Sequence, residues 1–151
     1  MREPHDMPDD GKMPAGLNPE LASSRHSADM SLLEQLAEFS QNAGEYGSAL
    51  EYYEQILRIA ERARESSGIL SHVLLRMAGC RSQTGDYAGA LEILQRAYAN
   101  LPDDASDVEV CRILNEKAFA LIRLGEYQKA EECVRRVTER VLEPEAAAQL
   151  A

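Results

Sequence analysis

Apolar residues recur along most of the chain at intervals of three and four positions, a spacing that places them on one face of an α-helix. The first such stretch starts near Asp29, contains a Ser31–Glu34 pair with the spacing of a capping box, and ends at Gly44. Further helices are predicted at residues 46–60, 69–84, 87–100, 106–124 and 127–143. No segment alternates apolar and polar residues with a period of two, so we expect helices and no strands.

The turns between these stretches repeat one another. Residues 44–51, 85–92 and 125–132 share the pattern Gly-acid-Tyr-x-x-Ala-x-Glu, and the alanines Ala49, Ala90 and Ala130 are 41 and 40 residues apart. An internal repeat with a period in the range of about 20–50 residues is typical of a solenoid. The pattern therefore predicts three copies of one helical hairpin.

Each copy resembles the tetratricopeptide repeat, whose unit is a helical hairpin with small residues where its helices cross and an aromatic residue just after the turn. The first helices have a large apolar residue and a small one at matching positions, namely Leu33, Leu74 and Leu114, then Ala37, Ala78 and Ala118. Lys117 departs from the pattern, because Leu36 and Met77 fill its position in the other copies. The period of about 40 residues is similar to that of long-repeat members such as kinesin light chains. The resemblance implies an all-α fold, a right-handed α-solenoid of three hairpins over residues 29–143.

The flanks differ from the repeats in composition. Residues 1–28 contain four of the six prolines and few side chains that build a core, so we expect a flexible tail. Asn18 and Pro19 also form a pattern that can start a short helix. Residues 144–151 form a short C-terminal segment with too few residues to cover the last hairpin as a full solvating helix would. We therefore expect either a longer parent protein or a homo-oligomer through the C-terminal hairpin.

Charge and cysteine content limit the possible partners. The 151 residues include 16 Lys and Arg against 26 Asp and Glu, a formal net charge of −10, which disfavours nucleic acid and membrane surfaces. No apolar run approaches the ~18 residues of a membrane span, and no secretory signal is evident, so a cytoplasmic location is expected. Cys80, Cys111 and Cys133 have neither zinc-site spacing nor a disulfide framework, and we interpret them as core residues.

Motifs for chemistry are missing from the sequence. The three histidines are isolated, no phosphate-binding loop occurs, and Gly85-Asp86-Tyr87-Ala88-Gly89 is explained by the hairpin turn. We therefore predict no enzyme activity, no catalytic residue, no metal site and no cofactor.

The resemblance also indicates where a partner would bind. In such arrays the first helices of successive hairpins line a concave surface that accepts an extended or helical peptide. By register, the predicted groove residues are Glu34, Glu38, Gln41, His72, Arg76, Arg112, Asn115, Phe119 and Arg123. Acidic side chains lie at one end and arginines at the other, which favours a protein or peptide partner of bipolar charge. Chaperone-binding members hold a terminal carboxylate in the first repeat, where Glu34 and Glu38 would repel it.

Three functions are compatible with these observations. The first is a non-enzymatic adaptor or scaffold that binds proteins through the groove. The others are a small tetratricopeptide chaperone of the bacterial secretion type, whose repeats are shorter, and a regulatory or oligomerisation module of a larger protein. For each groove residue the alternative is an ordinary solvated helix position. Leu75, Phe119 and Ile122 are compatible with either core packing or an anchor pocket.

Overall fold

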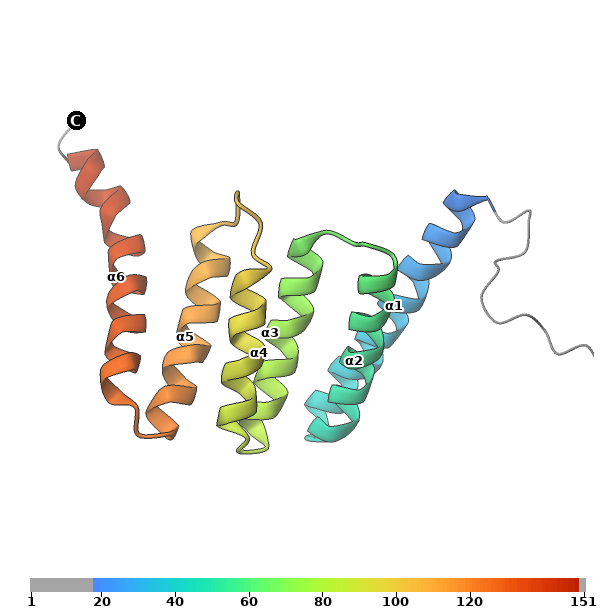
Figure 1. Cartoon of the computed structure of the whole chain (residues 1–151), viewed down its shortest axis with the longest axis horizontal. Helices are drawn as coiled ribbons and strands as arrows, with labels where there is room; N and C mark the ends of the chain where they lie inside the picture. The colour runs from blue at the N-terminus through green and yellow to red at the C-terminus, as the bar shows by residue number, and fades with distance from the viewer. Residues whose placement is uncertain (1–17, 150–151) are drawn as a thin grey trace, which may run out of the picture.

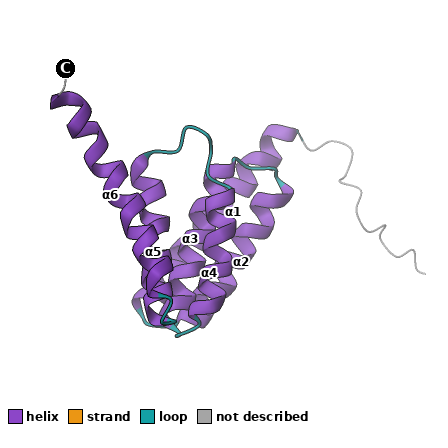
Figure 2. Ribbon diagram, turned by 60° about the vertical axis from the view of Figure 1, so that its left-hand side comes forward, coloured by secondary structure: helices purple, strands orange, loops and turns teal. Residues whose placement is uncertain are grey.

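A computed structural model describes residues 18–149, in which six α-helices follow one another without a strand (Figures 1 and 2). Their bounds are α1 (Pro19–Asn42), α2 (Tyr46–Arg62), α3 (Ser67–Gln83), α4 (Tyr87–Ala99), α5 (Asp107–Arg123) and α6 (Tyr127–Gln149). Helices α1 and α2, α3 and α4, and α5 and α6 pack as three hairpins, and α2–α3 and α4–α5 contacts join the hairpins into one array. The predicted all-α solenoid of three hairpins is confirmed.

The glycine turns have the predicted geometry. Gly44, Gly85 and Gly125 have φ values of 78°, 82° and 79°, in the left-handed region that residues with a Cβ atom rarely adopt. Each glycine reverses the chain after the first helix of its hairpin, which lets the second helix fold back on the first.

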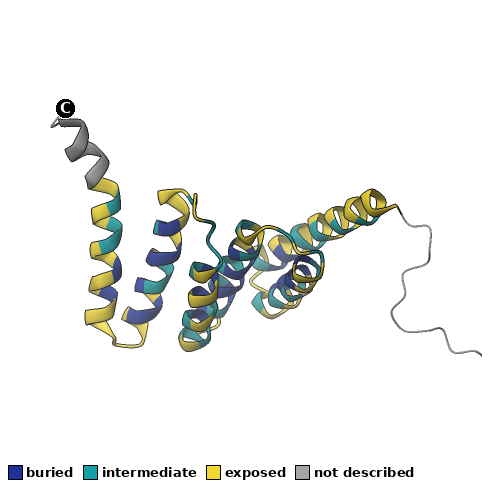
Figure 3. Cartoon of the chain, turned by 45° about the horizontal axis from the view of Figure 1, so that its top comes forward, coloured by how far each residue is buried: buried dark blue, intermediate teal, exposed yellow. Residues whose placement is uncertain are grey.

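Small residues lie where the helices cross. Ala49 and Ala90 are fully buried and Ala130 is 3% exposed, while Ala37, Ala78 and Ala118 occupy the facing positions in the first helices. An alanine at a crossing lets two helix axes approach to roughly 8–10 Å. The buried residues lie on the faces that the helices turn toward one another (Figure 3), as the repeat pattern predicts.

The start of α1 differs from the prediction. Residues 19–28, assigned to the tail, are helical, and Ser31 lies inside the helix, so the capping box proposed for Ser31 and Glu34 is wrong. Asn18 caps the helix instead: its Oδ1 accepts a hydrogen bond from the Glu20 N–H at 3.2 Å, and Pro19 occupies the first turn, where its missing N–H costs nothing. The remainder of the predicted tail, residues 1–17, lies outside the described residues.

The end of α6 also differs, since the helix passes Pro144 and continues to Gln149 rather than ending before the proline. A proline inside a helix removes one backbone hydrogen bond. The residues that follow it, Glu145 to Gln149, are mostly alanine and other strong helix formers, which favour continuation. A capping box does occur in the chain, at Ser106 and Glu109, where α5 begins.

Candidate binding groove

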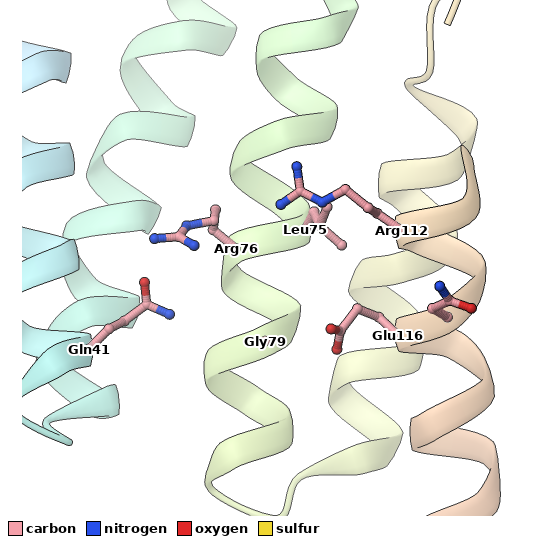
Figure 4. A pocket seen from close by; sticks show the side chains of 7 residues that line it. Gln41, Leu75, Arg76, Gly79, Arg112 and Glu116 are labelled. Atoms are coloured by element: carbon pink, nitrogen blue, oxygen red, sulfur yellow. The ribbon is translucent and has the colours of Figure 1, made fainter. Parts of the chain in front are cut away.

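The first helices of the three hairpins line a groove. Two adjoining hollows, of about 260 and 550 Å³, share Gln41 of α1, Gly79 of α3, and Asn115 and Glu116 of α5. Of the predicted groove residues, the structure brings together Gln41, Arg76, Arg112, Asn115 and Phe119 along these hollows. Figure 4 shows Arg112 and Glu116 extending from α5 toward α3, with Gln41 on the opposite side.

A hydrogen-bonded network joins the first two hairpins at the groove floor. The Tyr53 hydroxyl donates to Gln41 Oε1 at 2.8 Å and accepts from Arg76 Nε at 3.1 Å. Arg76 Nη2 also lies 3.3 Å from Glu38 Oε1. Burial raises the pKa of the Tyr53 hydroxyl, so it remains protonated and acts as a donor at neutral pH. Arg76 is therefore held in place, and Glu38 is partly neutralised within the protein.

Glu34 and His72 lie together at one end of the array. His72 Nε2 is 3.4 Å from Glu34 Oε1, and both line a third hollow of about 560 Å³ between α1 and the start of α3. Met30, Ile56 and Ile69 contribute apolar surface to this hollow. The two acidic residues predicted for the groove thus both face a basic side chain of α3.

The α5 side of the groove contains an aromatic and cationic cluster. Phe119 meets the Tyr87 ring edge-on, with centroids 6.1 Å apart, and is 47% exposed. Arg123 Nε donates to the Tyr87 hydroxyl at 3.0 Å, and its guanidinium lies over the same ring. Arg123 keeps its full charge, because a phenol does not neutralise it.

Arg112 and Asn115 have different surroundings. Both are exposed, and neither forms a hydrogen bond or ion pair with any residue that the structure describes. A guanidinium can bind a carboxylate with two parallel hydrogen bonds, and an amide can pair with a peptide backbone. This part of the groove offers polar groups to a ligand rather than to the protein itself.

Family comparison agrees with the architecture. Models of the tetratricopeptide repeat match residues 29–103 and 112–140. The chain belongs to the tetratricopeptide repeat family. No curated protein matches the chain. Tetratricopeptide repeats are generally protein-interaction modules, which fits a groove lined by side chains available to a ligand.

Several groove residues of this tetratricopeptide array were not predicted. Tyr46, Gln83 and Glu116 line the hollows, and Tyr87 supports Phe119. Glu116 follows Arg112 by four positions and shares its helix face, so periodicity alone would have found it. Tyr46 and Tyr87 each follow a hairpin turn, and the repeat motif explained them as packing residues.

One buried polar group faces the groove of the array. Ser82 is 5% exposed and lines the groove hollow of about 550 Å³. Its hydroxyl has no hydrogen-bond partner among the described residues. A buried hydroxyl without a partner costs free energy that a ligand can recover by bonding to it. Gly79, one turn earlier, has no atom within 4 Å of where a Cβ would lie, so the groove floor is open there.

Two of the three cysteines pack inside the tetratricopeptide fold. Cys80 and Cys133 are buried, and burial raises the pKa of the Cys80 thiol, which makes it a packing residue at neutral pH. Among the side chains that the structure describes, those of residues 18–142, no three metal-binding groups come together. No helix among the described residues is long and apolar enough to cross a membrane.

Proposed function

We propose that the protein is a non-enzymatic adaptor or scaffold that holds a segment of a partner protein in the groove formed by α1, α3 and α5. The observation that supports this most is the run of ligand-available groups along α5. Arg112 and Asn115 lack partners among the described residues, and Phe119 is about half exposed beside them. A cytoplasmic location is part of the same proposal.

The partner segment is expected to be bipolar, with its acidic part over α5. Arg112 and Arg123 both retain positive charge there, whereas Arg76 is paired with Glu38. An apolar side chain next to the acidic part would pack on Phe119. Attraction for a basic part at Glu38 is weaker than the sequence indicated, since Arg76 already pairs with this carboxylate.

The test starts with selection of binding peptides from a random displayed library against the whole chain. The selected peptide is then titrated against Arg112→Glu, Arg123→Glu and Phe119→Ala, with melting curves for each variant. We expect Phe119→Ala to weaken binding by about 2 kcal/mol or more, as for an aromatic anchor, and each charge reversal to weaken it in a salt-dependent way.

Arg58→Glu is the matched control, because Arg58 is an exposed arginine of α2 that lines none of the groove hollows. It should leave affinity nearly unchanged. If the three groove variants stay folded and bind as tightly as the parent chain, the groove is not the binding site.

The two other functions remain predictions. A secretion-type chaperone would bind an apolar segment of a secreted protein, and a regulatory module would bind another domain of its own parent protein. Both would use the same groove. The composition of the selected peptide separates the adaptor from the chaperone: an acidic and apolar sequence supports the adaptor, and a wholly apolar one supports the chaperone.

A further inference from the structure

The first helix carries an apolar stripe that does not face the groove or its own hairpin. Leu32, Leu36 and Phe39 lie on one face of α1 and are 59%, 38% and 73% exposed. By repeat register they correspond to Val73, Met77 and Cys80 of α3. Those three residues are buried and belong to one core cluster with α2, the last helix of the preceding hairpin. The stripe therefore occupies the face with which a hairpin packs onto the one before it.

The last helix exposes the other side of the same contact. Val134 and Val141 of α6 are 49% and 57% exposed. Their counterparts in α2, Tyr53 and Ala60, are both buried, and Tyr53 shares a core cluster with residues of the hairpin that follows. Leu94 of α4, the other counterpart of Val134, is fully buried as well. Helix α6 thus exposes, as far as the described residues show, a copy of the surface that α2 and α4 offer to the next hairpin.

We call the exposed stripe of Leu32, Leu36 and Phe39 the α1 edge, and the exposed surface of Val134 and Val141 the α6 edge. The two edges also match in side-chain size. At the joint between the first and second hairpins, the large Tyr53 and the small Cys80 are both buried and belong to the same core cluster. The equivalent pair at the next joint is Leu94 and Ala120, again large and small. Between the two edges the pair would be Val134 and Phe39, with the small residue on α6 and the large one on α1.

We propose that a second copy of this chain docks head to tail, its first hairpin packing on the third hairpin of its neighbour. The α1 edge is complementary to the α6 edge and not to itself, so the contact joins unlike surfaces and can propagate from copy to copy. The two edges lie at opposite ends of the array (Figure 1), so one molecule can bind two neighbours at once. Docking extends the solenoid. The groove of one copy, which ends at its α5, then continues at α1 of the next copy.

The contact is expected to be weak and dependent on salt. Each edge offers only a few apolar side chains, and copies with a net charge of −10 repel each other. Added sodium chloride screens this repulsion without weakening apolar burial, so association should strengthen as salt rises. A contact made mainly of surface ion pairs would respond in the opposite direction.

Sedimentation equilibrium of the whole chain over a concentration series tests the proposal. Phe39→Asp damages only the α1 edge, and Val134→Asp damages only the α6 edge. Each variant alone should be monomeric, because its intact edge has no intact partner. An equal mixture of the two should form a one-to-one dimer that grows no further. Val108→Asp is the matched control, since Val108 is 68% exposed and lies on α5, which carries neither edge, and it should associate like the parent chain.

Leu32→Asp and Val141→Asp form a second pair that covers the case in which one of the first variants fails to fold. A parent chain that stays monomeric at every concentration and salt level overturns the proposal and assigns the edges to another occupant. Association of either single variant with itself, to the extent of the parent chain, also overturns it, because that result means a contact between like edges.

Discussion

Asp86 shows how much of a hairpin turn depends on one side chain. Its Oδ1 accepts from the Gly89 N–H at 2.9 Å at the start of α4, and its Oδ2 lies 2.8 Å from Arg81 Nη1 at the end of α3. The backbone N–H of Gly89, with help from Arg81, lowers the pKa of this carboxyl below its usual value. One carboxylate therefore caps the second helix and ties it to the first.

Replacing Asp86 by alanine should cost about 1 kcal/mol of unfolding free energy at pH 7, the usual cost of losing a helix cap. The folded-state pKa lies below the unfolded value of about 3.9, so the stabilisation is complete above that value. It is lost as the pH falls through the folded pKa. Urea unfolding at pH 7 and in acid measures both, and the difference between parent and variant should shrink in acid.

Asp104→Ala is the control for Asp86→Ala, because Asp104 is an exposed turn residue without a hydrogen bond to the described residues. It should change stability little at either pH. A loss equal to that of Asp86→Ala would mean that general charge, rather than the cap, is responsible.

A substitution at Gly79 is expected to change stability and binding affinity in opposite directions. This residue lies within α3, where glycine costs roughly 0.5–1 kcal/mol relative to alanine, and a methyl group there meets no atom within 4 Å. Gly79→Ala should therefore raise the melting temperature while adding bulk to the floor of the groove. If a partner approaches this floor, affinity for the selected peptide should fall at least severalfold in a more stable protein.

Gly47→Ala is the matched control for Gly79→Ala, since Gly47 lies in α2, is open in the same way, and is outside the groove hollows. It should leave affinity unchanged. Unchanged affinity in Gly79→Ala as well would show that the ligand does not reach α3 at this point.

At the scale of the helices, most of the fold could be predicted from the sequence. Gly85 and Ala90 mark the turn and the crossing in a pattern that occurs three times, and repetition made the local signals unambiguous. The start of α1 was missed because two caps competed, and Ser31 had a capping-box spacing while Asn18 followed a proline-rich segment. Local pattern alone does not decide which of two caps a helix uses when its interior positions also suit a helix.

Register predicted some of the residues that line the hollows between α1, α3 and α5, among them Arg76 and Arg112, but not the contacts that these residues make. Their role in binding stays a prediction. The Arg76, Tyr53 and Gln41 network was not predictable, since its members come from three helices and no sequence spacing relates them. Contacts between helices also explain why the separation of acidic and basic groove residues is weaker in the structure than in the sequence, since Arg76 of α3 pairs with Glu38 of α1.

The central crossing gives a prediction for packing. Ala90 is fully buried where the helices of the second hairpin meet, so Ala90→Leu has no space for its extra atoms and should destabilise the protein by roughly 1–3 kcal/mol. Thermal or urea unfolding measures the loss. Ala88→Leu, at an exposed position of the same helix, is the control and should be close to neutral. An unchanged melting temperature for Ala90→Leu would contradict the alignment of the repeats.

At the scale of the whole molecule, stability is not evenly distributed. The first two hairpins share one core cluster that extends to Ile113 of α5, whereas the third hairpin closes a separate and smaller cluster around Leu114 and Leu121. In an array where each hairpin contacts only its neighbours, the middle unit is supported on both sides and the end units on one. The ends are therefore expected to open before the centre.

Amide hydrogen exchange in dilute solution should show this gradient. Amides of α3 and α4 should exchange most slowly, and those of residues 19–27 and 134–142 at least about tenfold faster, a difference of about 1.4 kcal/mol in opening free energy. If copies dock head to tail, raising the protein concentration should slow exchange selectively in α1 and α6 and leave α3 and α4 unchanged. The Phe39→Asp variant should show the gradient at every concentration, because its docking edge is lost. Equal protection along all six helices in the dilute protein would contradict the nearest-neighbour description, since it would require the array to open only as a single unit.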